Sequence, residues 1–246
     1  MIKVLHISDT HGYHEELNIP EVDLIIHSGD CSNHRDPYRN EKEVIDFLNW
    51  YAMVNCPNKI YVPGNHDTSI EKGLVHKLEF TDRGIDLLIN ESIKVLGKNI
   101  WGSPITPTFG QGWAWNMDRD KLHCVWESIP DETDILVTHG PPKGVLDISQ
   151  RRQRNAEGVK EYLNGVDFCG CTALKKRIDT FFPLIHMFGH IHDNHGIRNA
   201  GVAKLAGGIT LYSNAAVMED GNFDKGPIHN GNVFYLHDNG HISQNI

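Results

Sequence analysis

Five short apolar segments of the chain each run directly into a polar loop. The segments cover residues 2–8, 23–27, 59–62, 135–137 and 184–188. Unbroken runs of β-branched and apolar residues are typical of strands that are buried on both faces. In open α/β sheets, ligands bind beyond the carboxyl ends of the strands, so we expect the five loops to converge although they lie far apart along the chain.

Helical periodicity separates some of these predicted strands. Between residues 40 and 54, apolar side chains recur every three to four positions, which predicts a helix, and a second helix is predicted over residues 173–182. The alternation of strand, loop and helix predicts an α/β fold. Residues 85–104 and 196–243 have the pattern of short strands with tight turns and are predicted to form a second sheet on the first. Within the latter, residues 220–231 predict a polar surface loop.

The composition bounds the class of protein. The chain has 246 residues, of which 39% are hydrophobic and 22% charged, as in an ordinary globular protein. The sequence contains no linker, repeat or low-complexity stretch, so a single domain spanning residues 1–246 is the simplest organisation. The formal charge of −9 at pH 7 repels phosphate polyanions, so bulk nucleic acid is not expected as the main ligand.

The sequence also predicts the cellular setting. No apolar run approaches the roughly 18 residues of a membrane helix, and the first eight residues do not resemble a signal peptide. We therefore expect a cytoplasmic protein with no membrane partner. Five scattered cysteines favour reduced thiols. Cys169 and Cys171 lack the spacing of a zinc-binding pair and are predicted to pack near the start of a helix.

The polar loops carry most of the chemistry. They read Asp-Thr-His-Gly from Asp9, Gly-Asp from Gly29, Gly-Asn-His-Asp from Gly64, Thr-His-Gly from Thr138 and Gly-His-Ile-His from Gly189. Each motif alone occurs by chance, and a single buried histidine more often packs in a core than binds a metal. Their joint placement after five predicted strands, in a chain with 16 histidines, favours a metal site. Oxygen and imidazole donors without thiolate suit Mn²⁺, Fe or Zn²⁺.

In this order the motifs resemble the calcineurin-like metallophosphoesterase superfamily, whose pattern D-x-H, G-D, G-N-H-[DE], H and G-H-x-H is matched in full between residues 9 and 192. The resemblance implies a four-layer α/β/β/α sandwich of two mixed sheets flanked by helices. Residues 101–116, the loop at Thr138 and the segment around Cys171 also resemble one branch of the superfamily, the metallophosphoesterase-domain-containing phosphodiesterases linked to cyclic nucleotides.

The resemblance implies a site for two divalent metal ions. The implied ligands are Asp9, His11 and His192 at the first ion, Asn65, His139 and His190 at the second, and Asp30 bridging the two. Mn²⁺ is favoured, with Fe, Zn²⁺, Ni²⁺ and Mg²⁺ as alternatives. Two cations about 3.5–4 Å apart repel each other, so a shared carboxylate and a shared hydroxide are both electrostatically required.

Two further residues are implied to be catalytic. His66 follows the ligand Asn65 but is not itself a metal ligand in the superfamily. It resembles the residue that protonates or stabilises the leaving oxygen, and Asp67 is expected to orient the imidazole of His66 and to raise its basicity.

Together these residues predict a metal-dependent phosphoester hydrolase. The expected substrates are small phosphorylated molecules, with nucleotides favoured, cleaved by in-line attack of the hydroxide that bridges the ions. The ligands do not distinguish a phosphodiesterase from a phosphomonoesterase. A protein phosphatase and a non-catalytic metal-binding scaffold are the main alternatives, and a nuclease is disfavoured because the chain lacks long basic tracks. The sequence predicts no oligomeric state.

Other segments bear on the choice of substrate. Trp113 and Trp115 lie in an aromatic loop that either stacks on a nucleobase or packs a hairpin onto the second sheet. The basic cluster formed by Arg151, Arg152 and Arg154 either grips a second phosphate or a protein partner or forms a solvated surface, and the solvated surface is favoured. His14 and His34 lie near the metal loops, where they could touch substrate.

Overall fold

Both ends of the chain contribute to the first of two sheets. The computed structural model describes residues 1–154, 160–194 and 196–244. In these ranges the first sheet has the strand order β16-β15-β1-β2-β3-β4. Its strands are β1 (Ile2–Ile7), β2 (Leu24–His27), β3 (Asn58–Tyr61), β4 (Ile85–Leu87), β15 (Asn232–Leu236) and β16 (Ile242–Gln244). Strands β1 to β4 run parallel to one another, whereas β15 and β16 are antiparallel to their neighbours.

The second sheet has the order β13-β14-β12-β9-β6-β5 within the described ranges. Its strands are β5 (Glu91–Val95), β6 (Lys98–Ser103), β9 (Ile135–Thr138), β12 (Ile185–Phe188), β13 (Gly201–Lys204) and β14 (Leu211–Asn214). The four inner strands are parallel and the two edge strands antiparallel. The predicted division of strands between the sheets is therefore wrong in part. Strands β9 and β12 belong to the second sheet, whereas β4, β15 and β16 belong to the first.

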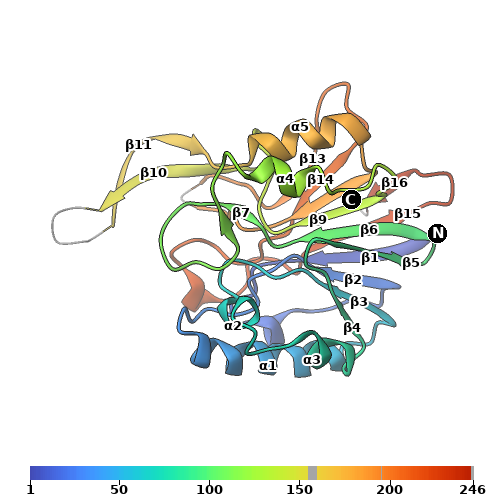
Figure 1. Cartoon of the computed structure of the whole chain (residues 1–246), viewed down its shortest axis with the longest axis horizontal. Coiled ribbons are helices and arrows are strands. Elements are labelled where there is room, and N and C mark those ends of the chain that lie inside the picture. Colours follow the sequence, from blue (N-terminus) through green and yellow to red (C-terminus); the bar gives the residue numbers. More distant parts are fainter. Residues whose placement is uncertain (155–159, 195, 245–246) are drawn as a thin grey trace.

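Three clusters of apolar side chains hold four layers together. One cluster joins the facing sides of the two sheets and includes Ile26, Ile60, Ile135 and Met187. A second packs α1 (Pro37–Met53) and α3 (Lys77–Thr81) on the outer face of the first sheet. A third packs α4 (Leu122–Trp126) and α5 (Thr172–Phe181) on the outer face of the second sheet. The predicted α/β/β/α sandwich of two mixed sheets is confirmed (Figure 1).

The long helix α1 is predicted correctly but begins earlier than its apolar pattern indicates. The side chain of Asp36 accepts a hydrogen bond from the backbone N–H of Arg39 at 3.1 Å, and Pro37 takes the first helical position. An aspartate cap followed by proline is a common start of a helix. The helix buries Phe47 and Leu48 against the first sheet, and burial of each such side chain stabilises the fold by about 1.5–3 kcal/mol.

The start of helix α5 confirms the prediction that Cys171 packs near a helix start. The Sγ of Cys171 accepts a hydrogen bond from the backbone N–H of Leu174 at 3.4 Å and caps the helix. Cys171 is buried, and Cys169 is partly buried. The other helical elements of the described residues are short: α2 (Thr68–Glu71), and the 3₁₀ turns η1 (His14–Glu16) and η2 (Phe223–Lys225).

Two small strand pairs lie outside the main sheets. Strands β7 (Thr106–Pro107) and β8 (Asn116–Met117) close the aromatic loop. Strands β10 (Ile148–Arg154) and β11 (Lys160–Phe168) form an antiparallel hairpin that projects from the body of the protein (Figure 1). Within the described ranges, no helix has the length and apolar character that crossing a bilayer requires. The cytoplasmic location stays a prediction.

Candidate metal centre

The five polar loops meet at one end of the two sheets, and their backbones are unusual there. Asp9, His11, Asp30 and His190 have φ values of 56°, 45°, 58° and 68°, in the left-handed region. Residues with a side chain adopt this region at a cost of about 1–3 kcal/mol, and such strain concentrates at functional sites. Backbone hydrogen bonds hold it: the N–H of Asp9 donates to Gly29 at 2.8 Å, and the N–H of His11 donates to Asp30 at 3.1 Å.

Two glycines in the motifs allow carboxylates to approach the backbone closely. A Cβ at Gly189 would lie 2.0 Å from Oδ2 of Asp9, and a Cβ at Gly64 would lie 2.2 Å from Oδ1 of Asp30. No other residue type fits such distances without displacing the carboxylate. The role of these glycines is therefore close approach, since neither has a positive φ.

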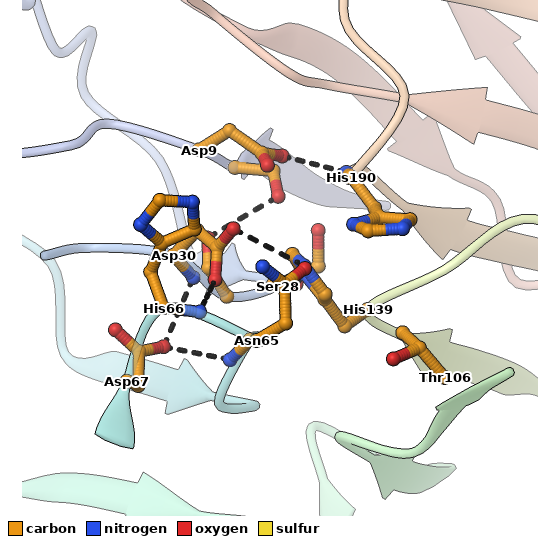
Figure 2. Close-up of polar contacts among 12 residues, drawn as sticks. Asp9, Ser28, Asp30, Asn65, His66, Asp67, Thr106, His139 and His190 are labelled. Carbon is orange, nitrogen blue, oxygen red and sulfur yellow. Dashed lines mark hydrogen bonds and ion pairs between the residues drawn. The ribbon is translucent and has the colours of Figure 1, made fainter. Parts of the chain in front are cut away.

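The seven predicted metal ligands are brought together. Among the described residues, three sets of side chains each place their ligand atoms within 4.8 Å of one another. The sets are Asp9 with His11 and His192, Asp30 with His139 and His190, and His11 with Asp30 and His66. Oδ1 of Asn65, the seventh predicted ligand, lies 2.9 Å from Nε2 of His139. Figure 2 shows Asp9, Asp30, Asn65, His139 and His190 around one centre.

The imidazoles are oriented as metal ligands require. Nδ1–H of His11 donates to the carbonyl of Ser32 at 3.0 Å, and Nδ1–H of His139 donates to the carbonyl of Ser28 at 2.8 Å. Each bond leaves the lone pair of Nε2 for a metal ion. Nε2 of His11 and Nδ1 of His192 are buried and have no hydrogen-bond partner among the described residues. These orphaned nitrogens fit a site that holds divalent ions.

The electrostatics of the site favour ionised carboxylates. Burial alone would raise the pKa of Asp30, but the nearby His139 and His66 outweigh burial and hold this pKa well below its ordinary value. The pKa of Asp9 is likewise lowered, because His192 outweighs burial. Burial lowers the pKa of His11 and of His190 to about 3. Ionised carboxylates and neutral imidazoles are the forms that bind metal.

His139 differs from these neutral imidazoles. Burial acts to lower its pKa, but Asp30, whose Oδ2 lies 3.4 Å from Nε2 of His139, outweighs burial and raises the pKa to about 9. Without a cation, this proton balances the charge of Asp30. A metal ion that binds at Nε2 has to displace the proton.

The predicted pairing of Asp67 with the ring of His66 is not what the structure shows. Asp67 is fully buried, and its Oδ2 accepts hydrogen bonds from the backbone N–H groups of Asp30 and Gly64 and from the hydroxyl of Tyr61, at 3.0, 2.6 and 2.6 Å. The ring of His66 instead donates from Nδ1 to the carbonyl of Asn33 at 3.1 Å. Asp67 thus positions the backbone on both sides of the centre rather than the imidazole.

A cavity of about 650 Å³ opens onto the centre. Its aromatic wall is formed by Phe109 and Trp113, whose rings lie 4.9 Å from the ring of His190 and 4.6 Å from that of His66. The guanidinium of Arg35 lies 3.4 Å from the centre of the Trp113 ring. Trp113 therefore faces the cavity. Trp115 packs against the core between the first sheet and α1, and not on the second sheet as predicted. Stacking of the loop on a nucleobase stays a prediction.

The basic cluster lies on the projecting hairpin, and its members differ. Arg151 is exposed and pairs with Asp167 at 2.9 Å, as a solvated surface predicts. Arg152 lines the cavity and pairs with Asp220 at 2.8 Å, which a solvated surface does not predict. The side chain of Arg154 lies outside the described residues.

The two histidines proposed to touch substrate lie elsewhere. His14 is buried beside Phe47, with its Nε2 3.5 Å from Asp46. His34 pairs with Glu43 at 3.7 Å. In the described part of the chain, neither lines the cavity. The loop predicted as polar surface instead contributes Phe223, whose ring stacks on His11 at 4.5 Å. Its glycine-rich, charged sequence carries no signal for this contact.

A family model described as calcineurin-like phosphoesterase matches residues 2–194. The chain belongs to this family. The human metallophosphoesterase domain-containing protein 1 is 31% identical over 234 residues, which cover 86% of this chain and 64% of that protein. This calcineurin-like phosphoesterase thus spans less than two thirds of the length of that relative. Membership of the family implies divalent metal ions, and the donor set described above fits them.

Solved structures support the fold of this calcineurin-like phosphoesterase. TT1561 of Thermus thermophilus superposes with a TM-score of 0.55 at 14% identity, covering 88% of this chain and 91% of that one. Phosphopantetheinyl hydrolase of Mycobacterium tuberculosis superposes with a TM-score of 0.50 at 13% identity, covering 86% and 88%. At these identities the likeness shows the architecture alone.

Proposed function

We propose that the protein is a phosphoester hydrolase with two divalent metal ions, acting on small phosphorylated molecules and favouring nucleotides. The observation that carries this proposal is the convergence of seven oxygen and imidazole donors, from five loops, on one centre that opens onto the cavity. The donors contain no thiolate, so we favour Mn²⁺ as the native ion. The named hydrolase activity of the mycobacterial structural neighbour is in keeping with this reaction class.

The division of ligands follows from the overlapping sets. Asp9, His11 and His192 would hold the first ion, and His139, His190 and Asn65 the second. Asp30 occurs in two of the three sets, which makes it the residue suited to bridge. When bound, the two cations supply Lewis acidity toward phosphoryl oxygens and lower the pKa of a coordinated water. The carboxylate of Asp30 reduces the repulsion between the cations.

His66 is suited to give a proton to the leaving group. Its ring lines the cavity, and the carbonyl of Asn33 accepts the hydrogen bond of Nδ1–H at 3.1 Å. That contact fixes the ring, and in the doubly protonated imidazolium it leaves Nε2–H as the group that can donate to an alkoxide oxygen. A donor positioned in this way contributes about 10²–10⁴-fold to a rate. The proton-donor role predicted from the sequence therefore remains our proposal, with Asn33 in place of Asp67 as the orienting group.

The cavity wall favours a nucleotide as the substrate class. Its volume of about 650 Å³ lies within the range of small-molecule sites. Phe109 is 47% exposed at the cavity and offers a flat apolar face on which a base can stack, a contact worth about 1–3 kcal/mol. Arg35 and Arg152 add positive charge to the lining in a chain whose net charge is negative.

A substrate panel with one matched pair of variants tests the proposal. The panel contains 2′,3′- and 3′,5′-cyclic nucleotides, nucleoside monophosphates and a phosphopeptide, each with Mn²⁺. We expect Mn²⁺-dependent hydrolysis of at least one nucleotide class, with loss of several orders of magnitude in Asp30→Asn. Asp46→Asn is the control, because Asp46 is an exposed aspartate whose contact is with His14, and this variant should keep wild-type rates.

The other outcomes identify the alternatives. Faster hydrolysis of the phosphopeptide than of every nucleotide would support a protein phosphatase and contradict the substrate class. Absence of hydrolysis with two ions bound would support the metal-binding scaffold and contradict the reaction.

A further inference from the structure

One aromatic ring contacts two of the three side chains that would hold the first ion. The ring of Phe223 stacks on that of His11, with centroids 4.5 Å apart and planes 21° apart. It also lies 5.3 Å from the ring of His192, at 30°. Phe223 belongs to the 3₁₀ turn η2, more than two hundred positions from His11 in sequence, and it lines the substrate cavity.

The segment that carries Phe223 is anchored to the immediate neighbours of the metal ligands. The backbone N–H of Val217 donates to the carbonyl of Ser8 at 3.0 Å, and the backbone N–H of Asp220 donates to the carbonyl of Asp193 at 2.9 Å. Ser8 precedes the ligand Asp9, and Asp193 follows the ligand His192. These two bonds fix the position of the turn relative to the first ion's ligands.

The far end of the turn is fixed as well. Gly226 has a φ of 74°, and a Cβ there would lie 2.3 Å from Oε2 of Glu16. The chain therefore leaves the turn through a position that only glycine fills without strain. The whole segment lies beyond residue 194, where the match to the family model ends.

The contacts with Phe223 restrict rotation of the two imidazoles, which their hydrogen bonds alone restrict only in part. An imidazole points its ligating nitrogen correctly only when rotation about its Cβ–Cγ bond is restricted, and groups around the ligands usually do this. For His11 one hydrogen bond from Nδ1 to Ser32 contributes. For His192 the corresponding hydrogen bond among the described residues joins Nε2 to the carboxylate of Asp9, which is itself a proposed ligand. A flat ring that stacks on His11 and lies tilted beside His192 limits the rotation of both imidazoles.

We propose that Phe223 is a positioning residue for the first metal ion, which orients His11 and His192 and thereby raises the affinity of that ion alone. The inference rests on the proposed two-ion function. The effect is confined to the first ion because, among the described residues, the aromatic contacts of Phe223 are with His11 and His192. His190 at the second ion contacts Phe109 instead.

Calorimetric titration of the metal-free protein with Mn²⁺ tests the inference without any substrate. Three variants distinguish the flat aromatic ring from apolar volume alone. Phe223→Ala removes the ring, Phe223→Leu keeps apolar volume without a flat face, and Phe223→Tyr keeps the ring. We expect two ions in each case. In the Ala and Leu variants one ion should bind about 10–100-fold more weakly and the other within twofold of wild type, whereas the Tyr variant should match wild type for both.

Phe182→Ala serves as the matched control, because Phe182 is an exposed phenylalanine at the end of α5, and its loss should change neither affinity. Wild-type affinity for both ions in Phe223→Ala and Phe223→Leu would overturn the inference, as would equal weakening of both ions, which would show a general loss of structure. If the Ala variant does not fold, the Leu variant decides. A wild-type protein that binds fewer than two ions would overturn the proposed function itself, and that result is read before any variant.

Discussion

The carboxylate of Asp67 accepts a hydrogen bond from the backbone N–H of Asp30 at 3.0 Å, across 37 positions of sequence (Figure 2). Asp67 is fully buried, and its other oxygen accepts from the hydroxyl of Ser32 at 2.7 Å. Burial and the nearby charge of Asp30 raise the pKa of Asp67. One carboxylate therefore connects the loop that carries Asp30 with the loop that carries Asn65 and His66.

Replacing Asp67 with Asn should destabilise the protein and weaken metal binding together. The amide nitrogen of Asn cannot accept a hydrogen bond, so at least one buried donor loses its partner, at a cost of about 1–3 kcal/mol. Urea unfolding and Mn²⁺ titration of Asp67→Asn measure both effects. Unchanged stability and metal affinity, with only the pH dependence of the rate altered, would show that Asp67 acts on His66 after all.

His66→Gln should retain both ions and slow catalysis in a manner that depends on the leaving group. In the proposed role His66 gives a proton to the leaving oxygen, so esters with poor leaving groups should slow by about 10²–10⁴-fold, and aryl esters with good leaving groups much less. Metal content and kcat for the two ester classes are the measurements. Equal slowing of both classes rules out the proton-donor role, and loss of an ion would mean that His66 is a ligand.

Some of this architecture is readable in the sequence, because its physical cause is local. The five strands and the two longer helices follow from runs and periodicities of apolar residues, and the cap formed by Asp36 and Pro37 is a local signal for the start of α1. The order of the motifs carries the resemblance to the calcineurin-like superfamily, and that resemblance implies the donor set. Convergence of the motifs needs only that parallel strands end at the same edge.

Other features depend on partners that no local pattern specifies. A strand buried on both faces has the same apolar sequence in either sheet, so the sequence did not show that β9 and β12 pair with each other in the second sheet. The partners of Asp67 come from two separate segments, residues 30–32 and residues 61–64. Phe223 lies in a loop of charged and small residues, and its contact with His11 depends on backbone bonds to Ser8 and Asp193.

Arg152→Ala should raise KM and leave kcat nearly unchanged. The guanidinium lines the cavity from the hairpin, where Asp220 holds it at 2.8 Å, so its charge attracts an anionic substrate before reaction. A hydrogen bond to a charged group contributes about 1.5–3 kcal/mol, and partial exposure reduces this to an expected rise in KM of about tenfold. Arg151→Ala is the matched control, because Arg151 pairs with Asp167 at 2.9 Å on the exposed hairpin. Equal effects of both variants would contradict a specific role for Arg152.

The protein should lose stability as the pH falls from 6.5 to 5. Burial lowers the pKa of His27 to about 3, whereas in the unfolded chain a histidine titrates near 6.5. The unfolded state therefore binds more protons in this window, and the free energy of unfolding decreases as the pH falls. In the fold, Nδ1 of His27 accepts from the backbone N–H of Gly29 at 3.1 Å, which a protonated ring cannot do.

Urea unfolding at several pH values, with EDTA present, measures this dependence. His27→Asn keeps an acceptor near Nδ1 without a titrating group, so its slope between pH 5 and 6 should be smaller by up to about 1.4 kcal/mol per pH unit. His123→Asn is the control, because His123 is exposed, and it should keep the wild-type slope. The same slope in His27→Asn as in wild type would mean that His27 is protonated in the fold.

Crystals soaked in Mn²⁺ and measured at the manganese absorption edge would locate the ions of the proposed two-ion centre. We expect two anomalous peaks in each chain. One should lie within bonding distance of Asp9, His11 and His192, the other within bonding distance of Asn65, His139 and His190, and Asp30 should contact both. A single peak, or peaks away from these side chains, would contradict a two-ion centre.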